Sequence, residues 1–385
     1  MNAELNAKSK SEALEELTEA TGQVLNAAVR KWTEQQGRIM GYICSAVPEE
    51  IFTAAGFLPF RLRATGSTGT ELSDAHFSSI NCSFVRHCFN MALLGEYDFL
   101  DGLVLVNSCD NVRRIYDHWT RQMKTPFVRI MSFPRKTDQP QVDWYQQELA
   151  NLRAGMQDHF DVDISDDRLW EAIGLHNETR RLQRELYDLR RAPEPAISGA
   201  DTLAVMVAGT AMPKAAYNRL LRDLLGDLKE GEGISGYRAR LMVLGSILDD
   251  PAYLRVIEDQ GGLVVTDSTC FGSRIMWKDV TEQPSDPLRA LAQYYVADRH
   301  SCPRTFGDHE RRAAFVRDMI RDFKVDGVIG ERLAFCDQWG FAQYSIESDF
   351  KEDGIPYLSL EREYVLGGVG QLRTRVQAFL ESLGS

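Results

Sequence analysis

The sequence predicts an α/β protein with two doubly wound parallel-sheet domains, flavodoxin-like or Rossmann-like, and additional helices. Short apolar runs alternate with segments of helical periodicity, which is the pattern of parallel strands joined by crossover helices. The segment DGLVLVNSCD (101–110) has a counterpart in DGVIGERLAFCD (326–337), and both start with Asp-Gly and end in Cys-Asp. The length of 385 residues also exceeds that of most single cores. We therefore expect one structural plan to occur twice.

An N-terminal helical arm is expected at residues 1–38, and a first α/β domain at 39–137. The arm carries apolar residues at helical spacing. In the domain, apolar runs bounded by turn residues predict four strands. These strands lie in RIMGYICSAVP (38–48), FLPFRLRA (57–64), DGLVLVNS (101–108) and TPFVRIMSF (125–133). Helices are expected between them at EEIFTAAG (49–56), at 78–94 and at NVRRIYDHWTRQM (111–123).

A helical segment with a linker is expected at 138–198, and a second α/β domain at 199–385. The segment has long helical patterns up to residue 191, and the linker is the Pro- and Gly-containing APEPAISG (192–199). The second domain is expected to open with an apolar strand, LAVMVAGTAMP (203–213), by analogy with 38–48. Its later strands are expected in LVVTDS (263–268), DGVIGERL (326–333) and IPYLSLERE (355–363).

Composition and charge exclude several classes of protein. The net charge of -12 argues against broad nucleic-acid binding, because neutralising phosphates requires an excess of clustered Lys and Arg. No apolar run approaches the roughly 18 residues of a membrane span, and the polar start of the chain is unlike a secretory signal. The expected location is the cytoplasm, where thiols stay reduced. The seven cysteines are therefore not expected to pair as disulfides.

Cys82, Cys109 and Cys336 are candidate metal ligands, with Cys270 and Cys302 in reserve. Cys109 and Cys336 follow predicted strands, and open parallel sheets bind their ligands beyond the carboxyl ends of the strands. The chain has no CxxC pair, so a site must be assembled from distant segments. Three thiolates fit an iron-sulfur cubane in which one iron is left open.

Two other roles for these thiols remain open. A lone cysteine is most often a small buried hydrophobe, and Cys44 and Cys88 fit that role. Cys109 could instead be a thiolate nucleophile, because the dipole of the helix that follows it would lower its pKa. A catalytic cysteine needs a positioned base, and no His and Asn arrangement is evident in the sequence.

Ser45 and Glu49, in CSAVPEE, are candidate catalytic residues at the end of the first strand. There they could serve a substrate carbonyl or a proton transfer. Structural roles compete with this interpretation, since Glu49 can complement a helix N-terminus and Ser45 can satisfy a turn. The glycines of VLGGVGQLRTR (365–375) could bind an anion or simply connect to the last helix. Neither GxGxxG nor GxxxxGKS occurs, so no nucleotide site is indicated.

Four segments resemble signature blocks of the 2-hydroxyacyl-CoA dehydratase D-component and benzoyl-CoA reductase family. They are CSAVPEEIFTAAGFLPFRL, CSFVRHCFNMALLGEYDFLDGLVLVNSCDNVRRIYDHW, FCDQWGF and GQLRTRVQAFLE. They occur in the family's order, between about Gly41 and Glu381. The second block is most similar to a small cluster-bearing subunit of class I, ATP-dependent benzoyl-CoA reductase.

The resemblance implies a cofactor, partners and a substrate. Cys82, Cys109 and Cys336 match the family's ligand positions for a [4Fe-4S] cluster held between two domains. Members work with a related cluster-bearing subunit, as a heterodimer, and receive electrons from a separate dimeric ATP-hydrolysing iron-sulfur activator. Their substrates are coenzyme A thioesters.

The implied function is that of an iron-sulfur subunit of benzoyl-CoA reductase, which reduces an aromatic acyl-CoA to a cyclic dienoyl-CoA. The close alternative is a subunit of a 2-hydroxyacyl-CoA dehydratase, which acts through a ketyl radical. The alternative of another class is a non-catalytic iron-sulfur protein for electron transfer or scaffolding.

Overall fold

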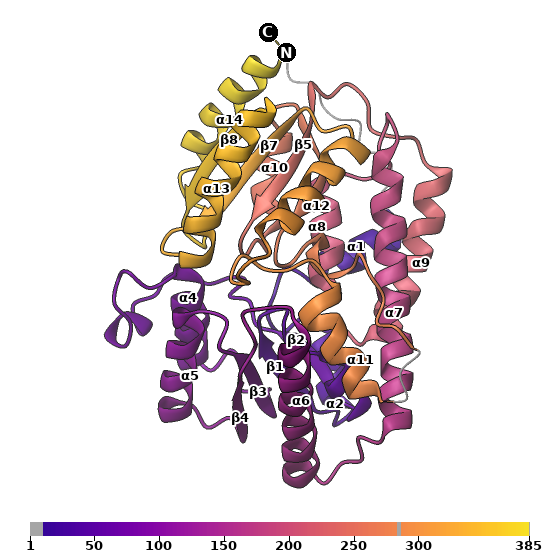
Figure 1. The fold of residues 1–385 in the computed structure, drawn as a ribbon, viewed down its shortest axis with the longest axis vertical. Coiled ribbons are helices and arrows are strands. Elements are labelled where there is room, and N and C mark those ends of the chain that lie inside the picture. Colours follow the sequence, from indigo (N-terminus) through magenta and orange to yellow (C-terminus); the bar gives the residue numbers. More distant parts are fainter. Residues whose placement is uncertain (1–10, 283–285, 385) are drawn as a thin grey trace.

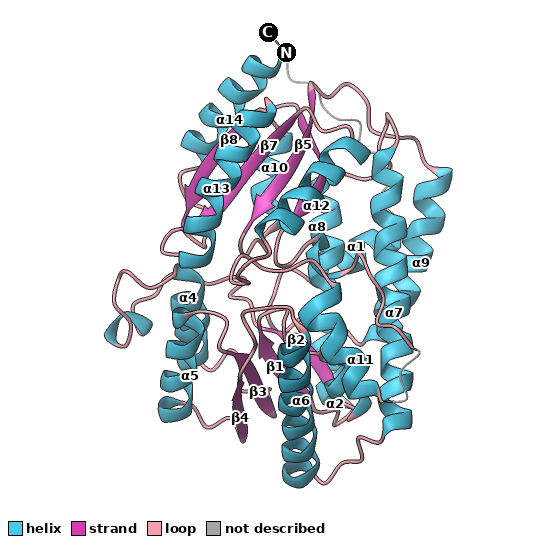
Figure 2. Cartoon of the chain, viewed as in Figure 1, coloured by secondary structure: helices cyan, strands magenta, loops and turns pink. Residues whose placement is uncertain are grey.

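The computed structural model describes residues 11–282 and 286–384, which form two separate parallel sheets (Figures 1 and 2). The first sheet has the order β2-β1-β3-β4 and the second the order β6-β5-β7-β8. Their strands are β1 (Ile39–Ile43), β2 (Leu58–Arg61), β3 (Gly102–Val106), β4 (Phe127–Met131), β5 (Ala239–Gly245), β6 (Gly262–Ser268), β7 (Gly327–Leu333) and β8 (Tyr357–Arg362). Both orders begin as in flavodoxin-like proteins. The predicted α/β class with two doubly wound sheets is confirmed.

Helices connect the strands and flank both sheets (Figure 2). In the first half they are α3 (Glu49–Ala54), the turn η1 (Ser73–Ala75), α4 (Ser83–Leu93) and α5 (Asp110–Gln122). In the second half they are α10 (Pro251–Glu258), η3 (Ser273–Ile275), α11 (Pro287–Gln293), η4 (Tyr294–Asp298), α12 (His309–Asp322), α13 (Asp337–Asp353) and α14 (Val369–Leu383). Helix α3 ends just before Gly56, whose φ of +81° is readily adopted only by glycine. The expected end of this helix is confirmed.

Other helices lie outside this repeated plan. The arm contains α1 (Glu12–Glu19) and α2 (Ala27–Glu34), while residues 1–10 of the predicted arm lie outside the described part of the chain. The predicted helical segment contains α6 (Gln139–Phe160), α7 (Asp166–Asp188) and the turn η2 (Leu189–Arg191). Helices α8 (Gly199–Ala208) and α9 (Lys214–Glu230) separate it from the second sheet.

The opening strand predicted for the second half is wrong. Most of the LAVMVAGTAMP run lies in helix α8, and the strand equivalent to β1 is β5, which the sequence analysis did not predict. Every residue of α8 except Asp201 is buried. A helix buried on all sides shows no polar face, so its apolar run cannot be told from a strand by periodicity.

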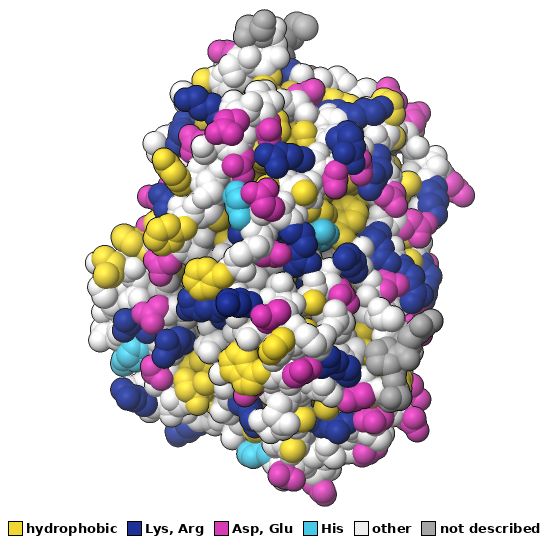
Figure 3. Space-filling model, in the orientation of Figure 1, with side chains coloured by type: hydrophobic (Ala, Val, Ile, Leu, Met, Phe, Trp, Pro, Cys, Tyr) yellow, Lys and Arg dark blue, Asp and Glu magenta, His cyan; other side chains and the backbone are white. Residues whose placement is uncertain are grey.

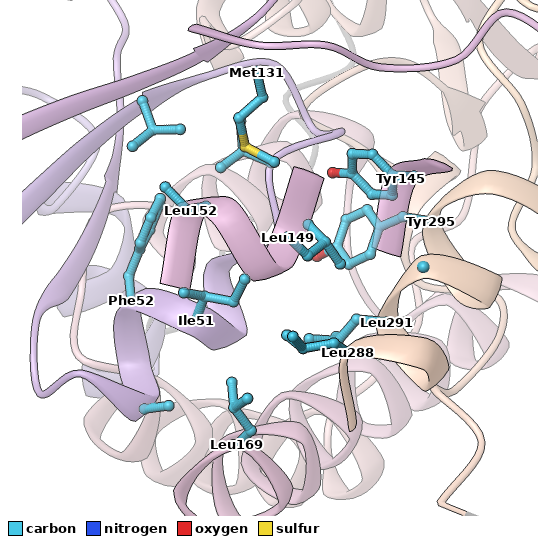
Figure 4. Close-up of a cluster of buried hydrophobic side chains, with 14 of the residues drawn as sticks. Ile51, Phe52, Met131, Tyr145, Leu149, Leu152, Leu169, Leu288, Leu291 and Tyr295 are labelled. Atoms are coloured by element: carbon cyan, nitrogen blue, oxygen red, sulfur yellow. The ribbon is translucent and has the colours of Figure 1, made fainter. Parts of the chain in front are cut away.

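A large core joins the first sheet to helices from both halves of the chain (Figure 4). Ile51 and Phe52 of α3 lie against Leu149 and Leu152 of α6, together with Leu291 of α11. Helix α11 belongs to the second half of the sequence but makes many contacts with α6. The boundaries proposed at residues 39, 138 and 199 remain predictions, and this core shows that the two halves are packed together.

The surface shown in Figure 3 mixes dark blue Lys and Arg side chains with magenta Asp and Glu side chains, and yellow apolar groups lie among them. Within the described part of the chain, no helix combines the length and the apolar character needed to cross a membrane.

A buried ion pair in the second sheet generates a stability prediction. Arg362 of β8 donates from Nε to Oε2 of Glu331 of β7 at 2.9 Å, and the Glu331 side chain is fully buried. Arg362→Met would leave an unpaired buried carboxylate, and we expect the free energy of unfolding to fall by about 3–5 kcal/mol. The exposed Arg168, which pairs with Asp163, serves as control, because Arg168→Met should change stability by less than about 0.5 kcal/mol. Equal losses in denaturant titrations of the two variants would contradict this account.

Candidate functional site

The loops that follow the strands of the two sheets meet at one interface. Arg61, the last residue of β2, donates from Nη1 to the carbonyl oxygen of Cys270, just beyond β6, at 2.7 Å. The amide of Ala64 donates to the hydroxyl of Tyr364, just beyond β8, at 2.9 Å. Ligands of open parallel sheets bind beyond the carboxyl ends of the strands. The interface between the sheets is therefore the candidate functional site.

The three predicted ligand cysteines come together at this interface. Cys82, Cys109 and Cys336 belong to one cluster of contacting side chains, and each is the N-cap residue of a helix, of α4, α5 and α13 respectively. Burial is the main reason why the pKa of Cys109 and of Cys336 is raised, and neighbouring thiols, Cys82 among them, raise it further. Two thiols come from the first half of the chain and one from the second.

Asn111 holds the three cysteine segments in register. Its Oδ1 accepts a hydrogen bond from the amide of Cys82 at 3.0 Å and another from Nδ2 of Asn81 at 3.0 Å. Its Nδ2 donates to the carbonyl oxygen of Phe335 at 3.5 Å, a long contact immediately before Cys336. Asn111 itself lies in the first turn of α5. One buried amide thus contacts the segments around all three thiols, which the sequence analysis did not foresee.

Three further thiols lie in the same electrostatic neighbourhood. In addition to burial, Cys270 raises the pKa of Cys336, and Cys44 raises the pKa of Cys109. Cys44 and Cys270 also raise the pKa of Cys302, for which burial is again the main cause. From their sequence positions, Cys270 and Cys302 are reserve candidates for metal ligands, and Cys44 is expected in the core. Cys44 follows β1 directly, so its place at a strand end was the signal that was missed.

The seventh thiol, Cys88, is fully buried within α4. It therefore has the structural role expected for it. Two backbone positions beside the site are unusual, since Cys44 has a φ of +82° and Phe335 a φ of +60°. Residues other than glycine seldom adopt this left-handed conformation, and it costs about 1–3 kcal/mol at each position.

Buried guanidinium groups surround the thiols. Arg274 donates from Nη1 to Sγ of Cys270 at 3.2 Å. Arg304 donates from Nε to the carbonyl oxygen of Ser108 at 3.1 Å and from Nη1 to that of Pro134 at 2.6 Å. Positive charge next to a thiol favours the thiolate form, which is the form that binds metals. These arginines can therefore offset the charge of several thiolates in a buried place.

Burial keeps these thiols protonated in the absence of a metal. It raises the pKa of Cys82 to about 11 and that of Cys109 to about 12, although backbone N–H groups at the helix N-termini act in the opposite direction. The expected lowering of the Cys109 pKa by the helix dipole is therefore outweighed by burial. A free thiolate nucleophile is disfavoured here, whereas a coordinated metal deprotonates a thiol outright.

The candidate donors are all thiols, which is the ligand type of most iron-sulfur clusters. Among the described residues, no group of three or more His, Cys, Asp or Glu side chains has an arrangement that could hold one metal ion. A cubane binds one cysteine at each iron corner, so its sulfur ligands stand further apart than those around one ion. Cys82, Cys109 and Cys336 are the three candidate ligands for such a cluster, and Cys44, Cys270 and Cys302 are further thiols of the same neighbourhood.

Ser45, which follows Cys44 in the chain, and Glu49 both line one partly enclosed cavity. Glu49 accepts a hydrogen bond from the hydroxyl of Tyr42 at 2.7 Å and pairs with Nζ of Lys214 at 2.6 Å. Burial is the largest single influence and raises the pKa of Glu49, but the charges of Lys214 and His176 and the hydrogen bonds from Lys214 and Tyr42 together outweigh it, so the net shift is downward. Glu49 is therefore a carboxylate, and it also lies in the first turn of α3. The structure brings both predicted residues to one cavity.

A comparison with protein-family models decides the family. Residues 44–383 match the model described as 2-hydroxyglutaryl-CoA dehydratase, D-component. The chain belongs to this family. The D-component match includes all seven cysteines and begins just after β1. The expected resemblance is confirmed.

Relatives in this family include a reductase and dehydratases. The chain is 26% identical over 364 residues to one of the subunits of benzoyl-CoA reductase from Thauera aromatica, covering 92% of this chain and 94% of the relative. It is 28% identical over 358 residues to the putative dehydratase subunit YjiM of Escherichia coli, covering 90% and 91%. It is also 26% identical over 366 residues to the (R)-phenyllactyl-CoA dehydratase beta subunit of Clostridium sporogenes, covering 92% and 94%. All three relatives are named as enzyme subunits.

Removing the Asn111 amide should loosen the site. In Asn111→Ala the buried amide of Cys82 loses its acceptor, so we expect the free energy of unfolding to fall by about 1–3 kcal/mol. Chemical denaturation measures this loss. Asn151→Ala, on the exposed face of α6, is the control and should stay within about 0.5 kcal/mol of the unchanged protein. A similar, small change in both variants would show that Asn111 does not hold the segments.

The stability of the protein should fall in mild acid because of His176. Burial lowers the pKa of His176 well below its ordinary value of 6.5, and Lys214 lowers it further. Below about pH 6.5 the unfolded chain takes up a proton here that the folded chain does not, so the free energy of unfolding decreases as pH falls. His176→Gln cannot titrate, and its stability should fall less steeply, by up to about 1.4 kcal/mol per pH unit. Parallel curves for the two proteins in denaturant titrations between pH 7 and 5 would contradict this.

Proposed function

We propose that this chain is the cluster-bearing subunit of an enzyme that acts on a coenzyme A thioester, with a [4Fe-4S] cluster bound by Cys82, Cys109 and Cys336. The observation that carries the proposal is the convergence of three thiols, each of an N-cap residue, from both halves of the chain at one buried interface. Their raised pKa values favour a metal-bound role over a free nucleophile. Three ligands leave one iron open to substrate.

The proposed chemistry is a one-electron transfer at low potential. A buried all-cysteine cluster can reach potentials down to roughly -700 mV, which suits reduction of a thioester that accepts electrons poorly. Arg274 and Arg304 limit the negative charge that builds up at the thiols. Ser45 and Glu49 face the neighbouring cavity, where the carboxylate of Glu49 can accept a proton and the Ser45 hydroxyl can donate a hydrogen bond to a carbonyl.

We favour benzoyl-CoA reductase as the specific activity, with the aromatic thioester reduced to a cyclic dienoyl-CoA. The similarity to the Thauera protein over nearly the whole chain supports this choice. A 2-hydroxyacyl-CoA dehydratase subunit is the alternative, supported by an equal identity to the phenyllactyl-CoA dehydratase subunit. An electron-transfer or scaffold protein that never meets substrate is the alternative of another class.

The proposed partners are a related cluster-bearing subunit and a separate dimeric ATP-hydrolysing activator, all in the cytoplasm. The relatives are named as subunits. Phe341 and Tyr344, in the first two turns of α13 after Cys336, are 84% and 80% exposed. Aromatic side chains so exposed are typical of protein interfaces, and a partner docked there would lie close to the thiols.

Iron analysis tests the cofactor. Protein purified without oxygen should contain four iron and four acid-labile sulfide per chain if one cubane is bound, and Cys82→Ala, Cys109→Ala or Cys336→Ala should lose most of them. Cys88→Ala is the matched control, because Cys88 is a buried thiol within α4, and it should keep its iron. If the protein contains more than four iron per chain and Cys302→Ala loses the excess, the further iron is bound near Cys44, Cys270 and Cys302. A folded wild-type protein without iron would refute the proposal.

Activity of the assembled complex separates the candidate functions. The chain, co-purified with its partner subunit and supplied with its activator and ATP, should reduce benzoyl-CoA to the dienoyl-CoA. Dehydration of (R)-phenyllactyl-CoA by the same preparation, without reduction of benzoyl-CoA, would select the dehydratase. An iron-loaded complex that leaves both thioesters unchanged would select the non-catalytic alternative.

A further inference from the structure

A second partly enclosed cavity lies in the second half of the chain, between α12 and α13, which pack on the same face of the second sheet (Figure 1). Leu244 of β5 and Ser268 of β6 line this α12–α13 cavity near the carboxyl ends of their strands. The strand order β6-β5-β7-β8 reverses at β5, and open parallel sheets bind ligands at such a reversal. Among the described residues, its wall has no residue in common with the cavity that holds Ser45.

Aromatic rings form much of the wall of the α12–α13 cavity. The imidazole of His300 stacks on the ring of Phe315, with ring centroids 3.4 Å apart and an angle of 17° between the planes. Trp339, Ile346 and Phe350 of α13 line the cavity as well. Pockets for small organic molecules are mostly apolar and aromatic, and aromatic rings pack favourably against one another. This wall therefore suits a flat, largely apolar ligand.

Two polar atoms of this wall have no hydrogen-bond partner within the described part of the chain. They are Nε1 of Trp339 and Nδ1 of His300. Trp339 is only 5% exposed, so its indole N–H has little access to water. Buried polar groups in native proteins nearly always have a partner, and leaving one without a partner is unfavourable. A ligand in the cavity can supply the missing partner.

The charged groups of the wall are already engaged with the protein. Arg274 donates to a backbone carbonyl oxygen at 2.7 Å, and Arg312 donates to another at 3.2 Å. Nε2 of His309 and Oδ2 of Asp349 form a hydrogen bond of 2.9 Å. Among the described residues, none of these four side chains has a buried nitrogen or oxygen atom left without a partner. The free hydrogen-bonding positions are thus ring nitrogens, which match an uncharged polar group.

A hydroxyl group matches both ring nitrogens. The indole N–H of Trp339 can only donate, so it requires an acceptor. Nδ1 of His300 donates or accepts according to the tautomer of the ring. A hydroxyl group is both a donor and an acceptor, and a flat ring that carries it would fill the space between the aromatic side chains.

We propose that the α12–α13 cavity binds an uncharged aromatic molecule with one hydroxyl group, of the phenol class, through Trp339 and His300. This inference goes beyond the proposed function, because the ligand is not a thioester and its cavity is separate from the one that holds Ser45 and Glu49. Neither iron nor a partner subunit is required for binding.

Ligand-observed NMR titration of the full-length protein with p-cresol tests the proposal. We expect saturable binding, and toluene, which lacks the hydroxyl group, should bind about threefold or more weakly because the hydrogen bonds are lost. Benzoate should also bind more weakly than p-cresol, since its charge must be desolvated. Absence of saturable p-cresol binding, equal affinity for toluene, or tighter binding of benzoate overturns the proposal.

Trp339→Phe keeps an aromatic ring but removes the N–H donor. Its affinity for p-cresol should fall about threefold or more, whereas its affinity for toluene should not change. A general loss of structure would weaken both. Trp144→Phe is the matched control, because Trp144 is 44% exposed on α6, and it should bind both molecules like the wild type. Wild-type affinity of Trp339→Phe for p-cresol overturns the proposal.

A second variant keeps the test decisive if Trp339→Phe fails to fold, as judged by circular dichroism. Ala313 is a buried residue of α12 that lines the cavity, so the larger side chain of Ala313→Leu would occupy the space of the ligand. We expect binding of p-cresol and of toluene to fall together. Unchanged p-cresol binding in this variant would place the ligand elsewhere and overturn the proposal.

Competition with benzoyl-CoA separates this site from that of a thioester. A saturating amount of benzoyl-CoA should leave p-cresol binding unchanged, because the two cavities are separate. Displacement of p-cresol would assign the α12–α13 cavity to the thioester and overturn the proposal. Since these measurements depend on neither iron nor turnover, their failure differs from the failure of the proposed function.

Discussion

Reciprocal arginine contacts between the two halves of the chain hold the site together. Arg304, from the second half, donates to the carbonyl oxygens of Ser108, Phe133 and Pro134 beyond the first sheet. Arg61, from the first half, donates to a carbonyl beyond the second sheet. A buried guanidinium is stable only when its donors are satisfied, so each arginine restricts the distance between the sheets. The positions of thiols from distant segments follow from this restriction.

The interface between the two sheets can bury several thiols without destabilising the folded chain. Neutral thiols are small apolar groups, and burial raises their pKa, so the thiols themselves bring little negative charge to this interface. If a metal deprotonated these thiols, the positive charges of Arg274 and Arg304 would offset the charge of the thiolates. Both arginines already have backbone partners, so they are stable beside neutral thiols as well.

Sequence patterns predicted most of the fold because the strands of both sheets are short apolar runs with clear turn residues. They failed at α8, which is buried on nearly all sides and was predicted to be the opening strand of the second half. For this reason they also missed β5, which is the real opening strand. The Cys-Asp pairs at 109–110 and 336–337 indicated two candidate ligand positions, since each follows the third strand of its sheet. Family resemblance, rather than spacing, selected Cys82 alongside them.

The remaining features of the site depend on contacts between distant segments, which the sequence does not display. Asn111 has no unusual sequence context, although its amide contacts three segments. The α12–α13 cavity likewise combines side chains from β5, β6, α12 and α13.

The left-handed backbone at Cys44 and Phe335 has a consequence for the stability of the protein. Glycine would adopt these conformations without strain, so replacing either residue by glycine would relieve the backbone. The chain instead keeps a thiol and an aromatic ring there and accepts a lower stability. Two residues beside the interface between the sheets thus hold backbone conformations that lower the stability of the folded state.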